Sequence, residues 1–192
     1  MALGKQAKIL TDAQIKTCLT HIQTMRTPQR NTVMFLLSVD AGLRAKEIAS
    51  ITWEMVTDAT GNLTDTIRLQ DKASKGKSGG VVYMSKRLVE ALSELQKSQN
   101  ATRGPIITSE RTRAPMSPNT VVCWFAGLYH SLGFEGCSSH SGRRTAITKW
   151  ARKISSVGGS LRDVQSLARH SSLQMTQRYI EVSEDAMRKV VG

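Results

Sequence analysis

The most informative stretch of this sequence is HSGRRTAITKWARKISSVGGSLRDVQSLARHSSLQMTQRY, which spans residues 140–179. It contains eight Lys or Arg residues and a single acidic residue, Asp163. A solvated helix normally interleaves opposite charges about four residues apart, because such pairs stabilise it. Since this stretch lacks that alternation, its positive charge indicates a surface that binds an anion.

The composition of the whole chain points the same way. Its 192 residues include 27 Lys or Arg against 15 Asp or Glu, which gives a formal charge of +12. Lys and Arg displace condensed counterions from phosphate backbones, so this surplus indicates a polyanionic partner. Apolar residues make up 40% of the chain, enough for a substantial core, and the length suits a single domain.

Features that the sequence lacks exclude several classes of protein. No apolar run approaches the ~18 residues that a bilayer requires, and the N-terminus has no apolar region of signal-peptide length. We therefore expect a soluble, cytoplasmic protein with no membrane partner. Three cysteines (Cys18, Cys123 and Cys137) without a C-x-x-C pair argue against a disulfide framework. Cys137 and His140 supply only half of a four-ligand zinc site, so we expect no metal.

The spacing of apolar residues predicts a mainly α-helical chain with one small antiparallel β-sheet. TDAQ (11–14) and SLRD (160–163) have the form of capping boxes, and Pro28 opens a second helix that Gly42 closes. Helices are expected from about residue 12, from about residue 161, and over residues 28–42, 43–48, 85–98, 118–133, 140–152, 173–180 and 184–190. Short strands are expected at residues 66–70 and 81–84, joined by the Gly, Ser and Lys loop DKASKGKSGG.

Three short motifs resemble those of a known family, the tyrosine recombinases or phage integrases. AGLRAKEI (41–48) resembles the family's G-L-R-x-x-E-[LI] box, and HSGRRT (140–145) resembles its H-x-x-R-[RH]-[TS] box. LARHSS (167–172), followed by TQRY (176–179), resembles its L-[GA]-H-[SK]-S and T-x-x-Y ending. Each motif alone is weak, but three in the family's order form a specific signal that covers about residues 11–190.

Two positions depart from the family's pattern. Gly142 stands where the family usually has a hydrophobic residue, and Arg169 replaces the customary glycine before the third-box histidine. Neither departure removes a functional group.

The resemblance implies the recombinase catalytic-domain fold, as one domain over residues 1–192. The family's N-terminal core-binding domain is not expected here, which suits either a natural minimal recombinase or an isolated catalytic domain. The implied partner is double-stranded DNA, on which the chain would form a homotetramer through its C-terminal helix. Accessory DNA-bending proteins remain open, and no cofactor is implied.

Phosphodiester chemistry explains why arginines belong in such a site. Attack on the phosphorus creates a pentacoordinate species with an extra negative charge, which many nucleases stabilise with carboxylate-bound metal ions. The sequence has no visible acidic cluster, so side chains must meet this charge. Arginine suits the task because its planar fork donates two parallel hydrogen bonds to phosphate oxygens. Arg44 and Arg143 are the candidates.

The resemblance assigns roles to the other catalytic residues. Tyr179 would attack the phosphorus and form a 3′-phosphotyrosine, releasing a 5′-hydroxyl. Because a free tyrosine has a pKa of about 10, it needs a nearby base or positive field. His140 is the expected proton acceptor, and His170 is expected to hydrogen-bond a non-bridging oxygen. Glu47, three residues after Arg44, is expected to orient or pack around the site.

A lysine of the hairpin loop would protonate the leaving 5′-oxygen. Counting from the first strand favours Lys72, whereas counting back from the second favours Lys75. We take Lys75 as the general acid, with Lys72 next and Lys77 last.

Two other functions use the same residues. A type IB topoisomerase-like enzyme would share the cleavage chemistry but relax one duplex instead of exchanging strands between two. A DNA-binding regulator on a recombinase scaffold would have lost some of the six catalytic positions, and none is lost here.

Overall fold

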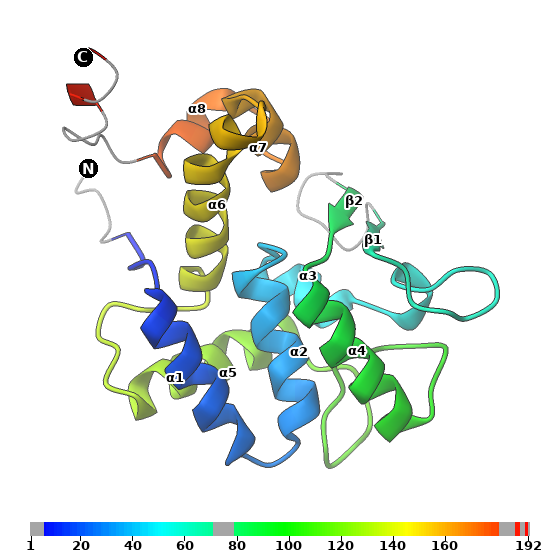
Figure 1. The fold of residues 1–192 in the computed structure, drawn as a ribbon. Coiled ribbons are helices and arrows are strands. Elements are labelled where there is room, and N and C mark those ends of the chain that lie inside the picture. The colour runs from blue at the N-terminus through cyan, green and yellow to red at the C-terminus, as the bar shows by residue number, and fades with distance from the viewer. Residues whose placement is uncertain (1–5, 71–78, 181–186, 189–190, 192) are drawn as a thin grey trace. The chain divides into compact units, whose positions relative to one another are not determined.

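The computed structural model describes residues 6–70, 79–180, 187–188 and 191, and Figure 1 shows its elements. The α-helices are α1 (Asp12–Gln23), α2 (Pro28–Val39), α3 (Ala45–Ser50), α4 (Lys86–Gln99), α5 (Pro118–Ser131), α6 (Ser141–Lys153), α7 (Leu161–Ala168) and α8 (Leu173–Gln177). The 3-10 helices η1 (Trp53–Met55) and η3 (Ile154–Val157) and the strands β1 (Thr66–Leu69) and β2 (Gly80–Tyr83) complete them. The fold class predicted from the sequence, mainly α with a small sheet, is confirmed.

Local capping signals set where the helices begin. At α1 the Thr11 hydroxyl accepts from the Gln14 amide at 3.2 Å, and Gln14 Oε1 accepts from the Thr11 amide at 3.0 Å. This reciprocal pair satisfies two of the N–H groups that a helix start leaves without partners. Ser160 and Asp163 form a second capping box at α7, so both predicted boxes are confirmed.

Several predicted helix boundaries are shifted, and three of these shifts have a visible cause in the backbone. α2 ends at Val39 rather than at Gly42, because Gly42 takes a left-handed φ of 64° and the Leu43 amide bonds back to Leu37 O at 2.9 Å. α3 begins only after Arg44, whose backbone is extended. α8 stops at Gln177 because the Tyr179 and Ile180 amides donate hydrogen bonds to carbonyls three residues earlier, as in a turn, and not four residues earlier, as in an α-helix.

The chain folds as two compact units, Met1–Ala146 and Ile147–Gly192. In the first, α2 packs between α1 and α4, and α3 packs against α5 (Figure 1). Its core is closed by large side chains with no solvent exposure, among them Trp53, Phe35 and Phe125.

The second unit has a smaller core. Ile147, Val164 and Ala168 are fully buried, and Trp150 and Tyr179 pack against them partly exposed. Tyr179 therefore packs against this core while part of its side chain is accessible.

The two strands form an antiparallel hairpin in which Thr66 pairs with Tyr83 and Arg68 with Val81. Ile67 and Val82 face the core, as the alternation of strand side chains requires. The predicted hairpin is confirmed, but the candidate lysines between the strands lie outside the described residues, as does most of the tail helix predicted at 184–190. None of the helices in the described ranges has the length and apolar character that crossing a bilayer requires.

Candidate active site

The predicted catalytic residues fall into two groups along the fold. Arg44, His140 and Arg143 belong to the unit Met1–Ala146, and His170 and Tyr179 belong to the unit Ile147–Gly192. The sixth, Lys75, lies outside the described residues, as do Lys72 and Lys77.

Arg44 is oriented by Glu47. The Glu47 side chain has 0% exposure, and its Oε2 accepts from the Arg44 backbone amide at 2.8 Å. Its Oε1 accepts from Arg44 Nη1 at 3.0 Å, so one carboxylate binds both ends of the same residue. This buried carboxylate thus has a charged partner and lies in the first turn of α3, where the helix dipole favours an anion. The Arg44 side chain is 24% exposed, so part of it is accessible to a ligand. This is the geometry expected of a residue that orients Arg44.

Arg143 is bound to the turn that precedes Arg44. Its side chain lies in the first turn of α6, the residue is only 3% exposed, and Nη1 donates a hydrogen bond to the Gly42 carbonyl. Gly42 takes the left-handed conformation that favours glycine, and its carbonyl is thereby presented to Arg143. The turn from Gly42 to Arg44 therefore carries one predicted arginine and holds the other.

The start of α6 fits closely against α2. A Cβ atom at Gly142 would lie 2.2 Å from Ser38 Oγ and 2.8 Å from Ser38 Cβ. The structure thus accounts for glycine at a position where the family usually has a larger residue. Any side chain here would displace the turn that carries Arg143.

The first turn of α6 is also fastened to the segment before α1. Thr145 Oγ1 accepts from the Leu10 amide at 2.8 Å, and Arg144 Nη1 donates to the Ala7 carbonyl at 3.0 Å. His140, the residue immediately before α6, is exposed, so its imidazole can reach a substrate or solvent. Its neighbours are fixed while the ring itself is accessible, as proton transfer to or from a ligand requires.

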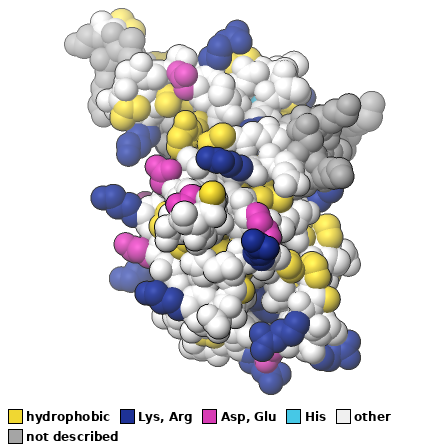
Figure 2. Space-filling model, turned by 90° about the vertical axis from the view of Figure 1, so that its right-hand side faces the viewer, with side chains coloured by type: hydrophobic (Ala, Val, Ile, Leu, Met, Phe, Trp, Pro, Cys, Tyr) yellow, Lys and Arg dark blue, Asp and Glu magenta, His cyan; other side chains and the backbone are white. Residues whose placement is uncertain are grey.

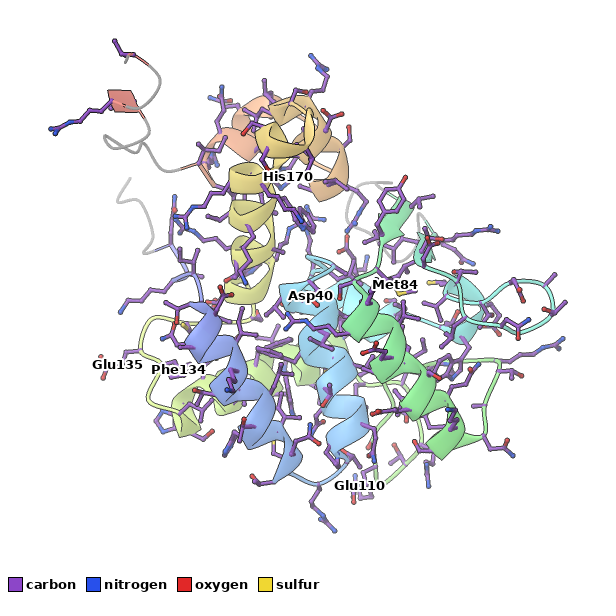
Figure 3. The ribbon with its side chains drawn as sticks, in the orientation of Figure 1. Asp40, Met84, Glu110, Phe134, Glu135 and His170 are labelled. Carbon is purple, nitrogen blue, oxygen red and sulfur yellow. The ribbon has the colours of Figure 1, made fainter. Side chains whose placement is uncertain are left out.

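His170 and Tyr179 lie together in the second unit. Their rings stack with centroids 5.3 Å apart and an interplanar angle of 24°. His170 follows the end of α7 (Figure 3), where Arg169 has a left-handed φ of 52°. This conformation explains why the family usually has glycine at position 169. Two hydrogen bonds hold the Tyr179 backbone. Its amide donates to Thr176 O at 3.0 Å, and the Thr148 hydroxyl donates to Tyr179 O at 3.3 Å.

Thr176 is a site residue to which sequence reasoning gave no role. It is fully buried, and its Oγ1 lies 3.0 Å from His170 Nδ1, so it fixes the orientation of the imidazole ring. The signal that could have found it is its place in TQRY (176–179), three residues before the tyrosine. A helical turn brings that position next to the tyrosine backbone.

Positive side chains are prominent on the surface of the protein. Figure 2 shows a face of the molecule over which Lys and Arg side chains are more widespread than Asp and Glu side chains. Within the described ranges, no three His, Cys, Asp or Glu side chains gather as they would around a metal ion. Two oriented arginines, an accessible histidine and a tyrosine beside a second histidine are groups that can bind and attack a phosphodiester.

Solved structures share this fold at low sequence identity. The Tn1549 transposon integrase in complex with a circular intermediate DNA is 17% identical with a TM-score of 0.75, and the match covers 98% of this chain and 66% of that one. XerA recombinase is 18% identical with a TM-score of 0.74, covering 99% of this chain and 64% of that one. A lambda integrase dimer bound to a COC′ core site is 20% identical with a TM-score of 0.68, covering 95% and 53%.

The chain thus spans just under two thirds of the length of the first two structures. Among curated proteins, no sequence matches it. The sequence pattern of one family matches residues 8–185, which include all three motifs and nearly the whole described fold. The chain is therefore a member of the phage integrase family.

Proposed function

We propose that this protein is a tyrosine site-specific recombinase that cleaves and rejoins double-stranded DNA through a covalent 3′-phosphotyrosyl link at Tyr179. The observation that carries the proposal is the binding of Arg143 to the carbonyl of Gly42, two residues before Arg44. This contact brings two arginines to one short turn, and Glu47 orients the first of them. Two guanidinium groups so placed suit the two non-bridging oxygens of one phosphate.

The arginines act by stabilising charge. As the phosphorus becomes pentacoordinate, its non-bridging oxygens gain negative charge, and donors already oriented toward them stabilise the transition state more than the ground state. Loss of one such donor typically costs about 3–4 kcal/mol, or about 10²–10³ in rate. Because the arginines supply this stabilisation, cleavage proceeds without a metal ion.

The remaining residues move protons. Tyr179 Oη forms a bond to phosphorus, its proton passes to His140, and the bond from phosphorus to the 5′-oxygen breaks. His170 donates a hydrogen bond to a non-bridging oxygen, and Lys75 gives a proton to the leaving 5′-oxygen. The phosphotyrosine keeps the energy of the broken phosphodiester, so a 5′-hydroxyl from another strand restores the DNA without ATP.

The assembly proposed for this chain follows from the same chemistry. Exchange between two duplexes needs four cleavages, so four protomers act on paired sites, each docking its C-terminal tail on a neighbour. We propose that residues 1–192 together form one catalytic domain. Accessory proteins that bend the DNA would be an additional component of the complex.

A nicked suicide duplex tests the proposal. It is built from the DNA that flanks the gene, and loss of a short 5′-hydroxyl fragment after cleavage traps the covalent complex. The wild-type protein should give an SDS-resistant protein–DNA band in excess EDTA. Tyr179→Phe should bind the duplex equally well and give no band, because only the nucleophilic oxygen is lost. A band from this variant, or a strict Mg²⁺ requirement for cleavage, would refute the mechanism.

Paired duplexes separate recombination from topoisomerase-like relaxation. A recombinase should convert two labelled sites into Holliday junctions, whereas an enzyme that only relaxes DNA leaves the two duplexes unjoined. Absence of junctions despite covalent cleavage would favour the topoisomerase-like function.

A substrate with a 5′-phosphorothiolate identifies the general acid. Sulfur is a good leaving group and needs little protonation, so it should rescue cleavage by Lys75→Ala but change little for Lys72→Ala or Lys77→Ala. Rescue of Lys72→Ala, together with a wild-type rate of Lys75→Ala on ordinary DNA, would assign the role to Lys72.

A further inference from the structure

Asp40 lies at the junction between α2 and the turn that holds both arginines. It is the residue that follows the last residue of α2 and precedes Ala41 and Gly42 (Figure 3). Its side chain is only 10% exposed. The chemistry described above gives this largely shielded carboxylate no role.

The side-chain hydrogen bonds of Asp40 among the described residues come from the start of α4. Ser85 Oγ donates to Asp40 Oδ2 at 2.6 Å, and Arg87 Nε donates to the same oxygen at 2.6 Å. Arg87 Nη2 donates to Oδ1, which completes a two-pronged ion pair. These partners lie 45 and 47 residues away in sequence, just after β2.

The position of Asp40 shows that this contact holds two segments together. A carboxylate at the end of a helix faces the negative end of the helix dipole, which is unfavourable for α2 on its own. The same carboxylate lies at the beginning of α4, where the dipole favours an anion, and Ser85 is the N-cap of that helix. The interaction with α4 therefore offsets the unfavourable one with α2 and fixes where α2 ends.

The turn after Asp40 is fixed at both ends as a result. Asp40 is anchored to α4 at its beginning, and Arg44 is anchored by Glu47 at its end. Between them the Gly42 carbonyl accepts from Arg143. If the first anchor is lost, the Gly42 carbonyl can shift, and both guanidinium groups shift with it.

We propose that Asp40 is a positioning residue that acts through this turn on Arg44 and Arg143, with Ser85 and Arg87 as its anchor. The inference rests on the proposed function, since it takes these arginines to bind the scissile phosphate. It predicts that breaking an ion pair outside the catalytic residues selectively weakens the stabilisation of phosphate charge.

The test compares cleavage of two suicide duplexes, one ordinary and one with a methylphosphonate at the scissile position. The methyl group replaces a charged non-bridging oxygen, so arginine positioning matters less on the second substrate. Asp40→Ala should slow cleavage of ordinary DNA on the order of tenfold to a hundredfold, as small misplacements of catalytic groups do. On the methylphosphonate its rate should approach that of the wild type, and duplex affinity should be unchanged on both.

Arg87→Ala breaks the same ion pair from the other side. Because the Arg87 side chain is 45% exposed, this variant should fold even if Asp40→Ala does not. It should reproduce the substrate dependence, and the double variant should be no slower than Asp40→Ala alone, because both remove one interaction. Ser117→Ala is the matched control. It removes the side-chain cap of α5, a 3.1 Å bond to the Thr120 amide, and should affect both substrates equally.

The outcomes distinguish the two proposals. If wild-type protein forms no covalent complex with either duplex, the proposed function fails, and the role of Asp40 fails with it. If the wild type cleaves but Asp40→Ala and Arg87→Ala slow both substrates by the same factor, as Ser117→Ala should, only the positioning role is overturned.

Discussion

Gly142 is where the close fit between two helices can be tested most directly. Replacing it with alanine adds one methyl group, which would lie 2.2 Å from Ser38 Oγ, 2.8 Å from Ser38 Cβ and 3.1 Å from the Ser38 carbonyl carbon. The hydroxyl can rotate away, but the Cβ and the backbone of α2 cannot. The start of α6 must therefore move, and Arg143 is the next residue.

The size of the effect follows from two opposing terms. Overpacking a filled core typically costs about 1–3 kcal/mol. Alanine gains up to about 1 kcal/mol over glycine inside a helix. We expect a net destabilisation of about 1–2 kcal/mol, which lowers the melting temperature of a protein of this size by about 2–8 °C. The rate of DNA cleavage should fall as well, even at temperatures at which the variant is fully folded, because the displaced turn carries Arg143.

Thermal unfolding and suicide-duplex cleavage measure the two effects. Gly127→Ala in α5 is the matched control, because nothing lies within 4 Å of the added methyl group, and it should raise stability. In a Ser38→Gly background the cost of Gly142→Ala should be smaller, because the two shortest contacts are removed and only the one to the backbone carbonyl carbon remains. If Gly142→Ala is as stable and active as the wild type, or if it costs as much stability in the Ser38→Gly background as in the wild type, the close fit of α6 against α2 is refuted.

Other positions give independent predictions. Thr27 has a left-handed φ of 55° and a buried hydroxyl without a hydrogen-bond partner among the described residues, so Thr27→Gly should raise the free energy of unfolding by about 1 kcal/mol in a denaturant titration. Burial raises the pKa of the Cys18 thiol to about 12, so alkylation at neutral pH should label exposed Cys123 first and Cys18 only on unfolding, as mass spectrometry would show. Thr176→Val removes the hydrogen-bond partner of His170 Nδ1 and should slow cleavage about tenfold at unchanged DNA affinity; an unchanged rate would exclude that contact from the mechanism.

Local signals explain the features of the fold that could be predicted from the sequence. The pairs Thr11–Gln14 and Ser160–Asp163 lie three residues apart, so their capping role is visible in the sequence and agrees with the structure. The position at which α2 ends was less predictable, because beside the local turn at Gly42 it involves Asp40 meeting α4 from 45 or more residues away.

The same distinction applies to the candidate site. The family motifs identified Arg44, Arg143, His170 and Tyr179 as candidates, since each motif is a short local pattern. Arg44 and His170 are held by neighbours three and six residues away, but the contacts that hold Arg143 and its helix are long-range: Arg143 and Gly42 are 101 residues apart, and Thr145 and Leu10 are 135 apart. No local pattern encodes such pairs, which is why the reason for glycine at position 142 emerged only from the packing of α6 against α2.

The central claim is that Tyr179 becomes covalently attached to the 3′ end of a DNA strand. The direct measurement is peptide mapping of the trapped complex after trypsin and nuclease digestion. Cleavage after Arg178 and Arg188 releases a peptide that begins at Tyr179, and this peptide should carry a nucleotide linked through its 3′-phosphate. Attachment to any other residue, or through a 5′-phosphate, would contradict the account.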